Sequence, residues 1–388
     1  MQNVAQLNAW LVSDGRMLGD ETQIISRYCH ALTELGVPLS RVRIGQSYAN
    51  PLISAWGMIW TPDRARKYTV PSGVLATSSW QGSPFQHVVD TRTCLRKRIL
   101  DLDLTVQHEV YAELAEGGVT DFFAIPLEYG DGSVQGSSFC TDDAGGFSDA
   151  HLAAIESTRH ALAAALEPIA MRESQQSLLR TYLGDGPARE IGNRHFKRGE
   201  HRAVSAAILF ADLRGFTAKS ETWPETELLA MMGDYFEMVV TPIHQQGGDV
   251  LKFMGDGVLA IFEASDDAQI ACAAAVKAAT ESLDNLRDYN AAAGRRGEDA
   301  IEFVIGIDYG AVTFGNIGSP DRLDFTVVGP AVNIASRVQG LCKELGESLL
   351  VSSNVAGHVR PLVQTIGEHQ VKGLGQEIEI FRVSSQPG

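Results

Sequence analysis

The stretch GGDVLKFMGDGVLAIF, residues 247–262, predicts a β-hairpin because two apolar runs flank a tight Gly-Asp-Gly turn at 255–257. A buried strand, AVSAAILFA at 203–211, precedes it, and the segment between them has the period of a helix with one apolar face. A long helix to about Asn290 and a strand at 301–308 follow. The order βαββαβ predicts a ferredoxin-like sheet with helices on one face.

Further elements extend this C-terminal region. Asp266 and Asp267 are suitable N-caps for the long helix. A second hairpin is predicted at 311–329. Pro330 fits the first position of a helix that runs to about Leu345, since that position needs no N–H.

Two aspartates follow strand ends in this arrangement. Asp212 comes at the end of the first strand and Asp256 lies in the hairpin turn. The first strand of a ferredoxin-like sheet adjoins that hairpin, so the two carboxylates are expected to converge. Such a pair suits hard divalent ions, whereas the plain alternative is that each aspartate only forms a turn.

Three more groups have residue types suited to a nucleotide. Backbone N–H groups near Phe216 and Thr217 could bind phosphate, and Lys372 could reach triphosphate oxygens as a point charge. Asn333 and Arg337 are four residues apart, so they share one helical face and could hold a ribose oxygen and a phosphoryl group. Taken singly, each group also fits an ordinary solvated surface.

Their order and spacing together are specific. The stretches are FADLRGFT at 210–217, the hairpin quoted above, IGIDYGAVTFGNIGSPDRLDFTVVGPAVNIASR at 305–337, and VKGLG at 371–375. From about His201 to Val383 the chain resembles the catalytic domain of the class III nucleotidyl cyclases.

The resemblance implies two Mg²⁺ or Mn²⁺ ions per site and active sites at a head-to-tail homodimer interface. One chain would supply the metal ligands, and the other the groups that contact the base and the transition state. The implied site residues are Asp212, Asp256 and Leu213 for the metals; Lys252 and Thr326 for the base; Asn333 for the ribose; Arg337 for the α-phosphoryl transition state; Lys372 for the terminal phosphates; and Phe216 and Thr217 for substrate.

The pair Lys252 and Thr326 favours adenine. Adenine offers N1 as an acceptor and its 6-amino group as a donor, which a lysine donor and a threonine acceptor complement. Guanine presents the reverse pattern and would want an acidic acceptor. The prediction is therefore an adenylate cyclase that converts ATP to cyclic AMP and pyrophosphate. A guanylate or other nucleotidyl cyclase and a catalytically silent nucleotide-binding dimerisation module remain as alternatives. Thr326 also resembles a subgroup stimulated by bicarbonate, which suggests bicarbonate as an effector.

The N-terminal half has a mixed α/β pattern. Residues 145–167, GGFSDAHLAAIESTRHALAAALE, resemble the last helix of a GAF-type sensor domain, with Ser148 or Asp149 as N-cap. We therefore expect an α/β (α+β) chain with a GAF-like sensor domain at 1–170, a helical linker at 171–200 and the cyclase domain at 201–388. The other elements predicted here are a helix ending near Gly36, strands at 42–45, 54–60 and 121–128, and a hairpin to Thr141.

Two sets of N-terminal residues have open interpretations. The first set is aromatic and could line a pocket or fill the core: Trp56, Trp60, Tyr68, Trp80, Phe85 and Phe122. The second set is basic and could bind an anion or cover a solvated helix face: Arg92, Arg96, Lys97 and Arg98. A helix at about 149–183 could pair with its twin in a dimer, although its apolar spacing is irregular for a heptad.

Composition limits the partners and the compartment. The formal net charge of −16 opposes binding to nucleic acid or an anionic membrane, both of which are polyanions. Five dispersed cysteines indicate reduced thiols rather than a disulfide framework. No signal-like N-terminus and no long apolar run occurs in the sequence, so a cytoplasmic protein without membrane insertion is expected.

Overall fold

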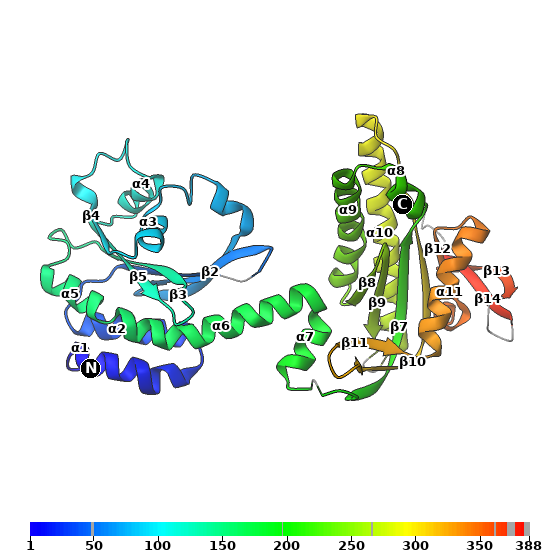
Figure 1. The fold of residues 1–388 in the computed structure, drawn as a ribbon, viewed down its shortest axis with the longest axis horizontal. Helices are drawn as coiled ribbons and strands as arrows, with labels where there is room; N and C mark the ends of the chain where they lie inside the picture. Colours follow the sequence, from blue (N-terminus) through cyan, green and yellow to red (C-terminus); the bar gives the residue numbers. More distant parts are fainter. Residues whose placement is uncertain (48–49, 196, 265–266, 361, 371–376, 384–388) are drawn as a thin grey trace. The chain divides into compact units, whose positions relative to one another are not determined.

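The computed structural model describes residues 1–47, 50–195, 197–264, 267–360, 362–370 and 377–383. The chain divides into two compact units, Met1–Leu178 and Leu179–Gly388. Each unit has its own sheet, and each is described by itself (Figure 1).

The sheet of the first unit is antiparallel and has the strand order β3-β2-β1-β6-β5-β4. The predicted strands at 42–45, 54–60 and 121–128 and the hairpin to Thr141 are confirmed. The strand β3 was not predicted because its RARKYTVP sequence is largely charged, as is usual at a sheet edge. The strands are β1 (Arg41–Ser47), β2 (Ile53–Thr61), β3 (Arg64–Pro71), β4 (Leu95–Arg98), β5 (Asp121–Glu128) and β6 (Val134–Thr141).

Helices cover both faces of this sheet (Figure 1). One face packs against α1, α2, α5 and α6 in a large apolar core, and the other lies under α3 and α4. Ser148 caps α5 as predicted, with a reciprocal bond from His151. The helices are α1 (Val4–Trp10), α2 (Glu21–Glu34), α3 (Pro84–Thr91), α4 (Glu109–Glu116), α5 (Asp149–Ser157) and α6 (Arg159–Leu183).

The structure resolves the two open interpretations differently. Trp56, Trp60 and Phe122 are buried in the cores, whereas Tyr68, Trp80 and Phe85 line a cavity under α3 and α4. The interpretation of the basic cluster as a helix face is wrong, because residues 95–98 form strand β4, which pairs with β5.

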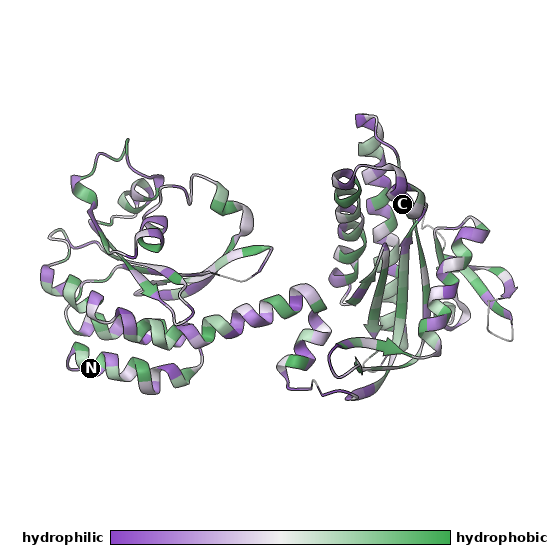
Figure 2. Cartoon of the chain, in the orientation of Figure 1, coloured by the Kyte–Doolittle hydropathy of each residue, from purple (hydrophilic) through white to green (hydrophobic). Residues whose placement is uncertain are grey.

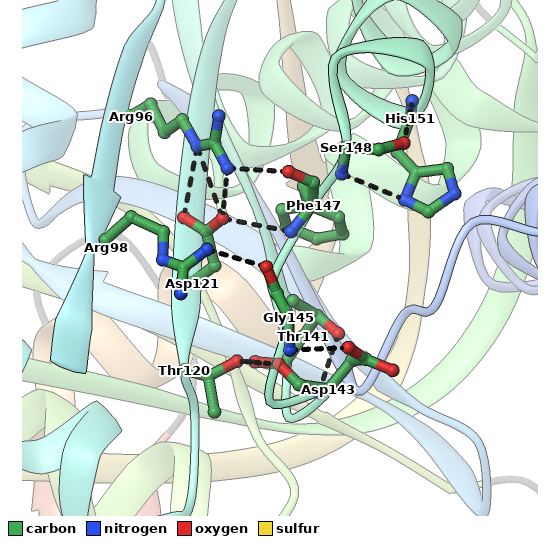
Figure 3. A network of polar contacts seen from close by, with 10 residues as sticks. All are labelled: Arg96, Arg98, Thr120, Asp121, Thr141, Asp143, Gly145, Phe147, Ser148 and His151. Carbon is green, nitrogen blue, oxygen red and sulfur yellow. Dashed lines mark hydrogen bonds and ion pairs between the residues drawn. The ribbon is translucent and has the colours of Figure 1, made fainter.

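Two arginines of β4 instead hold a loop in place (Figure 3). Arg96 donates to the fully buried carboxylate of Asp121 at 2.7 Å and to the carbonyl of Phe147 at 2.6 Å. Arg98 donates to the carbonyl of Gly145 at 2.6 Å, and the Phe147 N–H donates to Asp121 at 3.0 Å. These bonds fix the loop that leads into α5.

The second unit contains the predicted ferredoxin-like arrangement. Its sheet has the order β13-β14-β12-β10-β7-β9-β8, with β11 paired to β10. The first strand β7 lies between the last strand of the motif, β10, and the hairpin β8–β9. The strands are β7 (His201–Leu213), β8 (Asp249–Met254), β9 (Gly257–Glu263), β10 (Phe303–Gly318), β11 (Leu323–Val328), β12 (Leu349–Ser352), β13 (Val363–Gln370) and β14 (Glu377–Val383).

Helices α9 and α10 cover one face of this sheet, and α11 lies on the other with the β10–β11 hairpin (Figure 1). The central strands are the most hydrophobic part of this unit (Figure 2), as expected for strands covered on both faces. The helices are α7 (Asp185–Gly192), α8 (Phe216–Thr222), α9 (Glu225–Gln245), α10 (Ala268–Arg296), α11 (Pro330–Leu345) and α12 (Ser353–Ala356).

Three details differ from the sequence prediction. The strands predicted on either side of Gly310 are one continuous strand, β10. The helix α10 runs to Arg296, beyond Asn290, because alanines continue it until Gly297 ends it in the left-handed region at φ 76°. The segment after the break at Gly184 forms α7, which contacts β8 through Arg189 and Asp249 at 3.6 Å.

None of the helices within the described ranges combines the length and the apolar character needed to cross a bilayer.

Candidate active site

Asp212 and Asp256 lie together, as the strand order requires. Ala211 of β7 pairs with Val258 of β9, so the next residue of β7 adjoins the turn that carries Asp256. Burial and the neighbouring charge of Asp212 raise the pKa of Asp256 above its ordinary value. Two acceptors close to each other therefore form a region of strong negative potential.

One cation of the chain faces this pair. Lys343 of α11 donates to Asp212 Oδ2 at 2.7 Å, and Gln339, one turn earlier, donates to the same oxygen at 3.3 Å. The charge of Lys343 partly offsets the rise in the pKa of Asp256. The ammonium therefore neutralises only part of the negative charge.

A buried hydroxyl lies close to both carboxylates. Tyr235 of α9 is fully buried, and its Oη has no hydrogen-bond partner among the described residues. Burial raises its pKa, and the charges of Asp212 and Asp256 add to that rise. An unpaired hydroxyl beside two carboxylates leaves a polar position for a water or an ion to satisfy.

The donor set fits a hard divalent cation. Mg²⁺ is commonly held by one or two carboxylates, with water and substrate phosphates completing its coordination. In keeping with this, no group of three or more potential metal-ligating side chains occurs in the part of the chain that the structure describes. The side chain of Leu213, also implied as a metal residue, is 3% exposed, so its backbone carbonyl alone could serve.

Lys252 is paired with an acid that the sequence analysis did not single out. The residue lies on β8, and its ammonium donates to Asp324 of β11. Thr326 is two residues further along β11, where it pairs with Gly315 of β10. The structure thus places Lys252, Asp324 and Thr326 at neighbouring strands, with the ion pair between the first two.

Asn333 and Arg337 lie on a different face of α11 from the metal pair. Gln339 and Lys343, which contact Asp212, follow them by six residues each, which at 3.6 residues per turn is a rotation of about 120°. Neither Asn333 nor Arg337 forms a hydrogen bond or ion pair with another described residue. Both are therefore available to groups outside their own chain.

The remaining predicted residues have mixed positions. Gly215 adopts φ 71° immediately before α8, and the side chain of Phe216 packs against the core under α9. Thr217 is exposed at the first turn. Lys372 lies outside the described residues.

Sequence reasoning missed Tyr235, Lys343 and Asp324 as members of this site. Tyr235 has the spacing of an ordinary core residue of α9, so its position beside the aspartates depends on tertiary packing. Lys343 follows Gln339 by four residues, a helical spacing that places both on one face, but it lies beyond the quoted motif.

Comparison with known proteins supports the resemblance for the C-terminal half. Residues 199–384 match the family model for the adenylate and guanylate cyclase catalytic domain. The chain is 33% identical over 188 residues to an adenylate cyclase of Anabaena cylindrica and 29% identical over 199 residues to adenylate cyclase 1 of Rhizobium meliloti. These matches cover 46% and 50% of this chain but 36% and 29% of the relatives, so the chain spans about a third of their length.

Solved structures of both cyclase types are similar to the same half. The adenylyl cyclase CyaB from P. aeruginosa is 26% identical with a TM-score of 0.44, and the match covers 48% of this chain and 96% of that one. The guanylyl cyclase Cya2 is 31% identical with a TM-score of 0.42, and the match covers 49% and 97%. Because the family model itself includes both activities, the choice of base depends on the residues of the site.

Proposed function

We propose that this protein is an adenylate cyclase that converts ATP to 3′,5′-cyclic AMP and pyrophosphate. The observation that carries the proposal is the adjacent pair Asp212 and Asp256, in a region whose sequence matches a cyclase catalytic domain. The silent-module alternative is disfavoured because the metal, ribose and transition-state residue types are all present at the implied positions.

In the proposed reaction the ribose 3′-oxygen attacks the α-phosphorus, and the bond from that phosphorus to the pyrophosphate oxygen breaks. Mg²⁺ or Mn²⁺ bound at Asp212 and Asp256 would lower the pKa of the 3′-hydroxyl and neutralise phosphate charge. Asn333 orients the ribose, and the Arg337 guanidinium donates to the phosphoryl oxygens as their charge grows. Lys372 contacts the terminal phosphates.

The proposed enzyme is a homodimer. Asn333 and Arg337 face away from the Asp212 of their own chain, which supports their use with the metal pair of a second copy. The N-terminal unit is proposed as a GAF-type sensor that regulates this dimer. Bicarbonate remains a proposed effector on the basis of Thr326, and flat activity across a bicarbonate series at fixed pH and ionic strength would remove it.

One observation favours a second candidate, a guanylate cyclase. Guanine has an O6 acceptor and an N1–H donor, so it needs a cation and an acid side by side. Lys252 and Asp324 are such a pair. For ATP, the same acid would instead hold the Lys252 ammonium in position while Thr326 accepts from the 6-amino group.

The deciding experiment measures product formation from ATP, GTP, CTP and UTP by the purified chain with Mn²⁺, with Asp212→Ala as control. Cyclic AMP from ATP alone, lost in the variant, supports the proposal, whereas cyclic GMP as the main product favours the second candidate. If no nucleotide reacts, the assay is repeated on residues 179–388, which retain α7 on β8. Continued inactivity of a folded fragment would favour the silent module.

A further inference from the structure

The N-terminal unit contains a cavity of about 550 Å³ between its sheet and helices α3 and α4. That size is typical of small-molecule sites. Apolar side chains form much of the wall, among them Val70, Val74, Leu75, Trp80 and Val110. Nothing in the cyclase reaction uses this cavity.

A single arginine forms the charged part of the cavity. Arg43 of β1 lies with its guanidinium carbon 4.7 Å from the ring centre of Tyr68 and 4.6 Å from that of Phe85. Its Nε donates to the Tyr68 hydroxyl at 2.8 Å. The two rings and this bond hold the guanidinium in one orientation.

Two glycines make room for those rings. A Cβ at Gly57 would lie 2.5 Å from the Tyr68 hydroxyl oxygen, and one at Gly136 would lie 2.5 Å from Phe85 Cδ1. Any larger residue at either position would push a ring away from Arg43. The sheet is therefore built to let both rings lie close over it.

The outer edge of the guanidinium has no partner within the described ranges. Neither terminal nitrogen of Arg43 forms a hydrogen bond or ion pair there, and neither is sealed from solvent. The two glutamates that line the same cavity have other partners: Glu109 accepts from Ser79 at 3.1 Å, and Glu113 lies 4.0 Å from Arg41. An oriented, unpaired fork of N–H donors in an apolar cavity is suited to a carboxylate.

We propose that this cavity binds a small organic monoanion, an apolar aromatic body carrying one carboxylate, through the Nη groups of Arg43. Glu109 and Glu113 at the same cavity oppose a polyanion, so a nucleoside triphosphate is not the ligand class. The site concerns the N-terminal unit and does not depend on the cyclase proposal.

The test is calorimetric titration of the full chain, without nucleotide or divalent metal, using three aromatic acids and their neutral amides. The acids are 2-naphthoate, indole-3-acetate and 4-isopropylbenzoate, and each primary amide keeps the body but removes the charge. We expect at least one acid to bind with a Kd below about 1 mM and its amide to bind at least about tenfold more weakly. This comparison needs no variant.

Two variants then localise the binding. Arg43→Gln should weaken the bound acid at least about tenfold and leave the amide unchanged. Arg41→Gln is the matched control, because it removes the same charge two residues away on β1 from a side chain that does not line this cavity. Failure of all three acids to bind, equal binding of acid and amide, or unchanged binding by a folded Arg43→Gln chain would each overturn the proposal.

Discussion

Two aspartates at strand ends have opposite surroundings. Asp121, at the start of β5, is fully buried and accepts hydrogen bonds from the Arg96 guanidinium and the Phe147 N–H (Figure 3). Asp256, in the β8–β9 turn, lies instead beside a second carboxylate, Asp212. The fold thus supplies a full set of donors to one aspartate and places like charge next to the other.

The difference separates a structural acid from a functional one. Asp121 needs nothing from outside, because its charge and lone pairs are satisfied within the chain. The Asp212–Asp256 pair is compensated only in part by Lys343, and the Tyr235 hydroxyl beside it has no described partner. A site that is short of positive charge in this way is completed by a bound cation.

The largest effect that tests this comparison is loss of turnover. Asp212→Ala and Asp256→Asn should each lower kcat about 10³-fold, since they remove about 4 kcal/mol of charge stabilisation. Neither should lower the stability of the metal-free protein by more than a few tenths of a kcal/mol, because each relieves like-charge repulsion. Turnover and urea unfolding are measured on the same preparations.

Asp288→Asn, an exposed acid of α10, is the matched control and should keep full activity. Normal turnover by Asp256→Asn would contradict the assignment of the metal site.

The second test reverses the pattern. Asp121→Asn should cost about 2–3 kcal/mol of unfolding free energy, because the Arg96 guanidinium loses its buried partner while still lying in the loop junction. The unfolding midpoint in urea reports the loss. The exposed neighbour Asp142→Asn should change stability by less than about 0.5 kcal/mol. Equal stability of the two variants would show that the network in Figure 3 does not stabilise the unit.

The third test concerns the acid that holds Lys252. If ATP is the substrate, Asp324→Asn frees the ammonium and should raise KM for ATP by about tenfold with a smaller change in kcat. Asp321→Asn, an exposed acid in the same loop region, is the control. If GTP is the substrate, the same variant removes the acceptor for N1–H and should lower kcat/KM for GTP more than for ATP. Unchanged kinetics with both nucleotides would remove Asp324 from the site.

The sequence predicted the elements whose patterns are local. The hairpin around Asp256, the Ser148 cap and the helix that begins at Pro330 each depend on residues within a few positions, and each is confirmed. The charged edge strand β3 and the short strand β4 were missed, because pairing with a neighbour rather than apolar periodicity makes them strands.

The site was predicted to the same extent. The convergence of Asp212 and Asp256 follows from strand order, which the sequence indicates. The contacts of Tyr235, Lys343 and Asp324 depend on how helices and a hairpin pack across the sheet, and no local pattern specifies them.

The smallest expected effect is the pH dependence of stability that the aspartate pair produces. Asp256 has a raised pKa in the folded protein, so the folded state retains this proton at a pH where the unfolded chain has lost it. Stability from this group is therefore present at low pH and declines as pH rises from about 4 through the folded pKa. Urea unfolding of metal-free protein should show a shallower decline in Asp256→Asn than in the unaltered chain.

Solvent screens this half-exposed group, so the difference between the two chains should stay below about 1 kcal/mol. Raising the ionic strength should narrow it further, because the neighbouring charge of Asp212 is one of its causes. A steeper decline in Asp256→Asn would mean that the carboxylate is stabilised in the folded state, as Asp121 is. The pair would then lack the shortage of positive charge on which the metal assignment depends.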